Sequence, residues 1–284
     1  ITWSNSLNVA QMLDKSSYSI SLGNTHQDGI ISSTGMDRYN VKVSADTKLT
    51  NNWSSGFTAN YITTSIDKAV TSGNGLLRTV YAAPPSYDLA GIPSHVDGNP
   101  YTQNSFRGSF DNAYWAMENN KFTEDTNRFF GNVYTSYQTD FGTTNHKLNA
   151  KYMVGVDAYT THYVDSYGYG SNTGGGRGQI ENYGWTNATY NSLLTINYDW
   201  HINEDWGLNA VVGNEIIQSN RKKYYEYGTN YNFPGWNHIN NATTQQTEEE
   251  TWKNRTVGFF GNVSASYRNM LYLTLTGRQD YVSN

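Results

Sequence analysis

Residues 147–158 read KLNAKYMVGVDA, and apolar and polar side chains alternate along almost all of this stretch. Leu148, Tyr152 and Val154 fall on one parity, whereas Lys151 and Asp157 fall on the other. Side chains of a β-strand point alternately to its two faces, whereas a helix would scatter both kinds around its axis. The stretch therefore predicts a β-strand with one apolar face and one charged face.

The same alternation recurs along the chain. It is clear in residues 38–46, 193–202 and 257–280, where the acidic and basic side chains keep to the polar parity. Weaker versions occupy residues 7–13, 18–25, 53–64, 129–139 and 208–217. We expect about ten strands, most of them about as long as the roughly 9 to 11 residues of a tilted membrane strand.

The connections between these strands alternate in length. Short ones occupy residues 14–16, 48–52, 140–145, 203–205 and 268–270, and long ones occupy residues 26–37, 67–127, 161–190 and 220–254. Short turns at one rim and long loops at the other are typical of outer-membrane barrels, with periplasmic turns and extracellular loops.

The predicted fold class is therefore all-β, an antiparallel transmembrane β-barrel. A basic side chain on the lipid face near the bilayer midplane costs about 2 to 4 kcal/mol, and the clearly alternating segments place no charged residue on the apolar parity. A soluble β-sandwich, with the apolar faces packed into a core, is the alternative. Coordinates distinguish the two, because only the sandwich buries Val41, Val154, Ile196 and Leu273 together in a sealed centre.

Composition excludes several functions. The 284 residues contain no cysteine, so disulfides and thiolate metal sites are ruled out, and the net charge of -5 argues against a nucleic-acid partner. The six histidines lack metal-ligand spacing, and the run Glu248-Glu249-Glu250 is expected to be solvated, so no metal or cofactor is predicted. A mean hydropathy of -0.69 remains compatible with a barrel, because only every second residue of a strand faces lipid.

Several phrases occur in a familiar order: YSISLG (18–23) before DGII (28–31) and RYN (38–40), then APP (83–85) with DGNPY (97–101), RFFGN (128–132), GNE (213–215) and RQD (278–280). In this order the chain resembles, over nearly its whole length, the SusC/RagA-type family of TonB-dependent outer-membrane transporters of Bacteroidetes. The residues Tyr281-Val282-Ser283 depart from the small residues that usually follow the last phrase.

The resemblance implies a 22-strand barrel in the bacterial outer membrane around an N-terminal plug. It also implies a SusD-like surface lipoprotein over the extracellular mouth, and a TonB box pulled by the TonB-ExbB-ExbD complex. The sequence contains neither plug nor TonB box, and about ten strands cannot close such a barrel. We therefore expect residues 1–284 to be a central portion of the barrel domain, in contact with outer-membrane lipid.

Ligand contacts are expected in the long loops, where aromatic rings are abundant, and in the lumen. Rings of this kind stack on sugars, but they equally pack a loop on itself or on a lid protein. The candidate ligand-binding residues are Tyr81, Tyr87, Tyr114, Trp115, Tyr167, Tyr169, Trp185, Tyr227, Trp236, Arg278 and Asp280.

The expected function is import of a large nutrient, a glycan in preference to a peptide, without catalysis. The alternative is a complete small outer-membrane barrel that acts as a surface protease or an adhesin. A protease would use residues such as Asp199 and His201, which share a strand face and could orient one another for general-base catalysis. A pair wetted by a polar lumen explains the same spacing.

Overall fold

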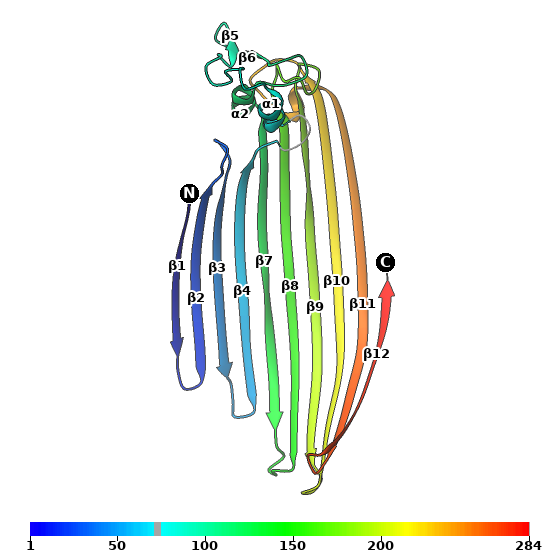
Figure 1. The fold of residues 1–284 in the computed structure, drawn as a ribbon. Coiled ribbons are helices and arrows are strands. Elements are labelled where there is room, and N and C mark those ends of the chain that lie inside the picture. Colours follow the sequence, from blue (N-terminus) through cyan, green and yellow to red (C-terminus); the bar gives the residue numbers. More distant parts are fainter. Residues whose placement is uncertain (71–74, 284) are drawn as a thin grey trace.

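The computed structural model describes residues 1–70 and 75–283, which form one long antiparallel sheet with a small folded layer at one end (Figure 1). The sheet has ten strands in the order β1-β2-β3-β4-β7-β8-β9-β10-β11-β12, so its strands pair in the order in which they follow along the chain. β5 and β6 form a separate two-stranded sheet. The strands are β1 Thr2–Met12, β2 Ser16–Asp28, β3 Gly35–Lys48, β4 Trp53–Lys68, β7 Lys121–Thr139, β8 His146–Tyr167, β9 Gln179–His201, β10 Trp206–Tyr231, β11 Ala242–Tyr267 and β12 Leu271–Ser283.

The layer at the end is the cap, which we define as residues 75–120 together with the connections 168–178 and 232–241. It contains α1 Leu76–Ala82, β5 His95–Val96, β6 Asn99–Gln103, α2 Ala113–Asn119 and the 3-10 turn η1 Ile239–Asn241. In Figure 1 the cap covers the upper ends of β7 to β11, and the short turns lie at the opposite end of the sheet. None of these helices, within the described residues, has the length and hydrophobicity to cross a bilayer.

The strand register sorts the two parities onto two faces. One row of paired residues runs across β8 to β12 through Leu148, Tyr198, Ala210, Val263 and Leu275. The row beside it runs through Lys147, Asp199, Asn209, Ser264 and Thr274. Cross-strand pairing thus gives the sheet one apolar face and one polar face, as the alternation predicted.

The apolar face is a surface, not a core. Val41, Val154 and Leu273 are 41%, 46% and 62% exposed, and Ile196 is half-buried. The buried apolar side chains of the described residues gather instead in the cap and at the adjoining strand ends. The sandwich alternative is therefore wrong, and the apolar face is the one that meets lipid.

We call this exposed stretch the apolar band; on β8 it extends from Leu148 to Ala158. The ten steps between these eleven residues, at about 3.4 Å each and tilted by about 40°, span roughly 26 Å, close to the height of about 25 Å typical of outer-membrane barrels. Aromatic pairs mark its lower border, with ring centroids 4.9 Å apart in Trp53–Tyr137 and 4.8 Å apart in Trp206–Tyr267. These side chains have the outward parity, as the interfacial girdle of a barrel requires.

The strands are much longer than predicted, and all four long loops are shorter, since the one expected at 67–127 is bounded by Lys68 and Lys121. β10 has 26 residues and β8 has 22, so the loops expected at 26–37, 161–190 and 220–254 shrink to 29–34, 168–178 and 232–241. Beyond the apolar band the outward parity of β10 becomes polar at Gln218, Asn220 and Lys222, which removes the alternation. The cross-strand ladder continues there because it needs no lipid.

Gly131, in the phrase RFFGN, permits a close approach between β7 and β4. A Cβ atom at this position would lie 2.2 Å from the carbonyl oxygen of Thr58, whereas a Cβ at Gly155 on the next strand would meet nothing nearer than 3.5 Å. We expect Gly131→Ala to destabilise the fold by about 1 to 3 kcal/mol because the backbone must shift. Gly155→Ala, the matched control, should be near neutral. Urea unfolding followed by tryptophan fluorescence measures both, and equal midpoints would contradict the close approach.

The sheet is open. Within residues 1–70 and 75–283, β1 and β12 each pair with one strand and not with each other. An unpaired sheet edge is not tolerated in lipid, so further strands must complete the barrel. A complete ten-stranded barrel, the basis of the protease or adhesin alternative, is therefore wrong.

Candidate functional site

The polar face of the sheet carries a cluster of aromatic rings between the apolar band and the cap. We call it the lumen aromatic patch and define it as Tyr163, Tyr183, Trp185, Tyr225 and Trp252. They lie on β8, β9, β10 and β11 and share the parity of Asp157 and Asp199. The register brings Tyr163, Tyr183 and Tyr225 into one row and places Trp252 opposite Arg221.

The rings of β8 and β9 support one another. Tyr163 and Tyr183 stack with centroids 4.8 Å apart and planes 7° from parallel. Trp185 meets both rings edge-on, at 5.6 Å and 6.1 Å. Offset and edge-to-face contacts of this kind each add about 0.5 to 1.5 kcal/mol beyond burial. The three rings therefore form a rigid base.

Two cations complete the patch. Lys68 lies with its Nζ atom 4.5 Å from the centroid of Tyr163 and 3.5 Å from a carboxylate oxygen of Glu124. The Arg221 guanidinium is 5.4 Å from the Trp185 ring and 5.5 Å from the Trp252 ring. Arg221 therefore sits between two indoles, and Trp252, which is 46% exposed, remains accessible from the lumen.

The tyrosine hydroxyls of the patch remain protonated at neutral pH. Burial raises the pKa of Tyr225 to about 12, with Glu181 adding to the effect. Burial also raises the pKa of Tyr183, whose hydroxyl donates to Asp165 Oδ2 at 3.1 Å. Both residues lie above the apolar band. The patch thus combines ring faces, hydroxyls and one sandwiched cation, a set suited to an oligomer with rings and hydrogen-bonding groups.

Arg278 and Asp280, predicted as lumen ligands, lie lower in the lumen and bind each other. Arg278 Nε donates to Asp280 Oδ1 at 2.9 Å, and its Nη2 donates to Glu215 Oε2 at 2.9 Å. The guanidinium thus bridges two carboxylates across β10 and β12. Arg278 and Asp280 are brought together, but well apart from the aromatic patch.

The side-chain geometry of Asp199 and His201 does not support the catalytic alternative. Asp199 accepts hydrogen bonds from Asn209 at 2.6 Å and from Asn197 at 2.9 Å. Across residues 1–70 and 75–283, no hydrogen bond or ion pair joins Asp199 to His201. The described residues also hold no group of three or more side chains of the metal-binding kinds.

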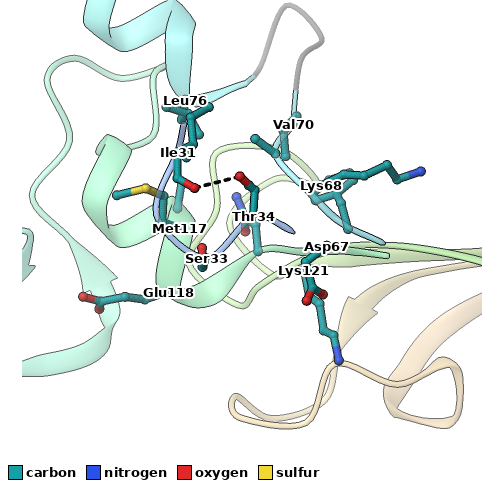
Figure 2. Close-up of a pocket in the computed structure, with 14 residues that line it drawn as sticks. Ile31, Ser33, Thr34, Asp67, Lys68, Val70, Leu76, Met117, Glu118 and Lys121 are labelled. Atoms are coloured by element: carbon teal, nitrogen blue, oxygen red, sulfur yellow. Dashed lines mark hydrogen bonds between the residues drawn. The ribbon is translucent and has the colours of Figure 1, made fainter. Parts of the chain in front are cut away.

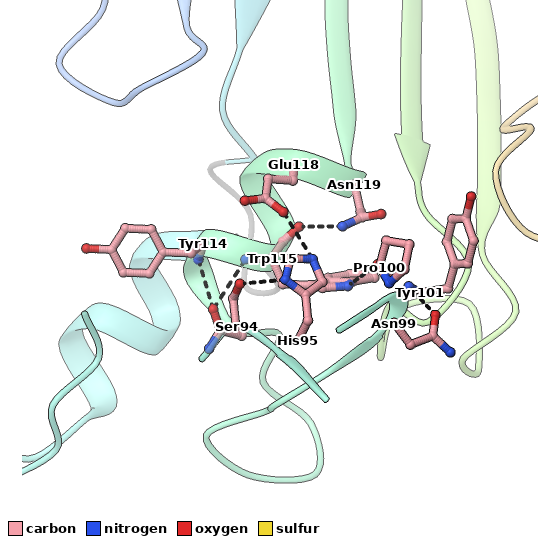
Figure 3. A network of polar contacts seen from close by, with 10 residues as sticks. Ser94, His95, Asn99, Pro100, Tyr101, Tyr114, Trp115, Glu118 and Asn119 are labelled. Atoms are coloured by element: carbon pink, nitrogen blue, oxygen red, sulfur yellow. Dashed lines mark hydrogen bonds and ion pairs between the residues drawn. The ribbon is translucent and has the colours of Figure 1, made fainter. Parts of the chain in front are cut away.

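In the cap, Trp115 is a core residue and not a ligand platform, so this candidate is wrong. It is completely buried, and its Nε1 donates to the carbonyl oxygen of Pro100 at 2.8 Å (Figure 3). Asn112 caps α2 by accepting from the backbone N–H groups of Tyr114 and Trp115, at 3.0 and 3.2 Å. Tyr114 lies on the exposed side of the same helix and is 42% exposed.

Within the cap, a buried carboxylate fastens the segment 75–120 to the connection after β8. Asp111 accepts hydrogen bonds from Ser171 Oγ at 2.6 Å, from the Asn172 backbone N–H at 2.7 Å and from Gln103 Nε2 at 2.8 Å. His95 Nε2 lies 3.1 Å from a carboxylate oxygen of Glu118 on α2 (Figure 3). These contacts tie distant segments together and make the cap a fixed cover.

The other candidates divide by exposure. Tyr167 is buried at the end of β8, with its ring 5.2 Å from that of Phe122, and so is unavailable to a ligand. Tyr81 and Trp236 are 84% and 44% exposed on the cap. Tyr87 packs edge-on against Phe106, Tyr169 borders the small core around Ile180, and Tyr227 lies in β10 on the lumen parity.

A cavity of about 390 Å³ lies between the β2–β3 connection, the end of β4, the start of β7 and the two cap helices (Figure 2). Ile31, Val70, Leu76 and Met117 form an apolar wall, and Lys68, Asp67, Lys121 and Glu118 add charges of both signs. This mixed lining selects no single class of ligand. The cavity contributes less to a functional hypothesis than the lumen aromatic patch does.

Sequence reasoning identified Trp185 but left Tyr163, Tyr183, Tyr225, Trp252 and Arg221 outside the selected set. These residues fall in the predicted long loops 161–190 and 220–254, because the apolar parity ends below them. The sequence does contain a signal for these positions. Glu181, Tyr183 and Trp185 occupy every second position and continue the polar parity of β9 toward the cap.

No protein-family model matches the chain. The TonB-dependent receptor P26 of Formosa agariphila is 24% identical over 295 residues, which cover 93% of this chain and 26% of the receptor. The RagAB peptide importer in its open-open state has a TM-score of 0.80 and 16% identity, covering 99% of this chain and 31% of that chain. The ferric preacinetobactin receptor BauA of Acinetobacter baumannii has a TM-score of 0.55 and 12% identity, covering 99% and 39%.

The chain spans about a quarter to two fifths of the length of these proteins. The predicted transmembrane barrel is confirmed, and so, at the level of fold, is the resemblance to the SusC/RagA-type transporters. The outer-membrane location is confirmed by the same relationship. All three proteins are named as receptors or importers, in line with the prediction that the barrel catalyses no reaction.

Proposed function

We propose that this chain, which has the fold of a TonB-dependent transporter barrel, forms part of the wall of an outer-membrane importer for an oligomeric nutrient. The observation that carries the proposal is the lumen aromatic patch. It lies on the polar face, above the apolar band and below the cap, where cargo entering from outside would first meet the wall. The complete protein would contain the remaining barrel strands, a plug and a TonB box.

A glycan is the favoured cargo. The exposed face of Trp252 matches the apolar face of a pyranose ring, and the Arg221 guanidinium beside it can donate to ring hydroxyls or carboxylates. The packed base beneath them reduces the ordering cost of binding. The remaining candidates from sequence, Tyr227 on the lumen face and Tyr81, Tyr114 and Trp236 on the cap, would contact cargo or a covering protein.

A peptide is the second candidate cargo, because two of the similar structures are titled as a peptide transporter and a peptide importer. By the same comparison we propose a SusD-like lipoprotein over the cap and energy supply from TonB-ExbB-ExbD.

The test is uptake by cells that carry the full-length transporter. Deleting the gene should abolish growth on one oligosaccharide or one peptide mixture as sole nutrient, and the nutrient affected identifies the cargo. Trp252→Ala should weaken binding of that nutrient about tenfold, equivalent to about 1.4 kcal/mol, and Trp252→Phe should restore most of it. Trp206→Ala is the matched control, because this tryptophan is 45% exposed on the outward face. Normal growth after deletion on every nutrient tested would remove the import proposal.

A further inference from the structure

The outward face of β10 and β11 changes from apolar to basic within one residue pair. Ile216 pairs with Val257 at the top of the apolar band, and the next outward pair is Gln218 with Arg255. Above it Asn220 pairs with Lys253, and Lys222 follows on β10. We call Lys222, Lys253 and Arg255 the outward basic patch.

The patch keeps free donors. Arg255 Nε donates to Gln218 Oε1 at 2.9 Å, and Arg255 Nη2 donates to the same oxygen. These bonds fix the guanidinium and leave its other N–H groups unused. Lys253 is exposed and makes no ion pair or hydrogen bond among the described residues. Lys222 Nζ is 2.8 Å from a carboxylate oxygen of Glu249. The local charge is therefore positive on a chain whose net charge is -5.

The position of the patch defines its partner. An outward-facing group directly above the apolar band lies at the depth of lipid headgroups, and the exposed Tyr190, which pairs with Gln218, marks the same interfacial level. Clustered lysine and arginine at that depth bind anionic headgroups, and a guanidinium matches the geometry of phosphate oxygens. Protein partners of the lumen or cap would not reach this face.

We propose that the outward basic patch binds the phosphate groups of a phosphorylated glycolipid in the outer leaflet. The inference rests on the proposed function only for its orientation, in which the cap lies outside the cell. The apolar band would contact the acyl chains while Arg255 and Lys253 bind the phosphates of the same molecule. Lys222 remains partly neutralised by Glu249 and contributes less.

The test uses the purified full-length protein in phosphatidylcholine nanodiscs that contain either bisphosphorylated lipid A or lipid A with both phosphates removed. Native mass spectrometry then counts the lipid A molecules retained. Wild type should retain only the phosphorylated form. Each cation removed should cost about fivefold, so Arg255→Gln combined with Lys253→Gln should weaken retention about 25-fold.

Lys223→Gln is the matched control, because Lys223 is the neighbour of Lys222 but lies on the opposite face of β10. This variant should bind lipid A as wild type does. Excess inorganic phosphate should fail to displace the lipid; displacement would identify a free-phosphate site and overturn the proposal. Equal retention by the double variant, or of the dephosphorylated lipid, would overturn it too. This experiment does not measure nutrient uptake, so its result can be interpreted even if the import test fails.

Discussion

Replacing Trp115 by alanine is expected to unfold the cap while the barrel wall stays intact. The indole is completely buried and joins α2 to Pro100 by its hydrogen bond, and a Cβ at Gly170 would lie 3.1 Å from its Cζ2 atom. Truncating a buried tryptophan costs about 3 to 5 kcal/mol, and apart from Phe110 the other buried side chains of the described cap are small or polar. Hydrogen exchange should rise throughout residues 95–120 and stay slow in β8 to β10.

Tyr114→Ala provides the control for this prediction. Tyr114 is the neighbour of Trp115 on α2 and is 42% exposed, so its truncation should leave exchange in the cap nearly unchanged. Trp115→Phe should fall between the two, because it keeps most of the ring volume and loses the bond to Pro100. A Trp115→Ala protein with wild-type exchange would show that the cap is held by other contacts, and exchange rising equally in the strands would show that cap and wall unfold together.

Placing arginine at position 212 is expected to destabilise the membrane-embedded barrel, whereas arginine at position 211 should be tolerated. Val212 lies within the apolar band and is 56% exposed on the outward face, and Val211 points to the lumen. A lipid-facing arginine near the midplane costs about 2 to 4 kcal/mol, whereas lumen positions accept charge. Unfolding in lipid vesicles, followed by the mobility of unheated samples on gels, measures both variants of the full-length protein.

This pair of variants tests the assignment of the two faces directly. Equal destabilisation by Val212→Arg and Val211→Arg would mean that neither face is selectively in lipid. Greater damage at position 211 would reverse the faces and remove the lumen aromatic patch from the lumen. The folding yields of the two variants in detergent micelles provide a second measurement of the same difference.

The parts of the fold that depend on alternation were predictable. The five short turns fall within a residue or two of their predicted positions, because each ends a run such as 147–158 or 193–202 in which the two faces differ in polarity. The upper halves of β8 to β11 were not predictable in this way. There water bathes both faces, so polar residues such as Gln218 and Asn220 follow the strand without any periodic signal.

The site was harder to predict than the fold. Trp185 was recognised as a ligand candidate from its ring alone, although its strand was not. Trp115 was misassigned for a physical reason: a short helix packed against distant turns buries its tryptophan through contacts with Pro100 and Gly170, which lie apart in sequence. Arg278 and Asp280 share the lumen parity two residues apart on β12, whereas the bond from Arg278 to Glu215 depends on the pairing of β10, β11 and β12.

The length of β10 has a consequence for the size and shape of what passes. Its ladder continues 15 residues past Ile216 to Tyr231, roughly 50 Å along the strand at 3.3 Å per residue, or about 38 Å of height at a tilt of about 40°. In the importer proposed above, a wall of that height would allow several units of a linear polymer to lie along the lumen at once.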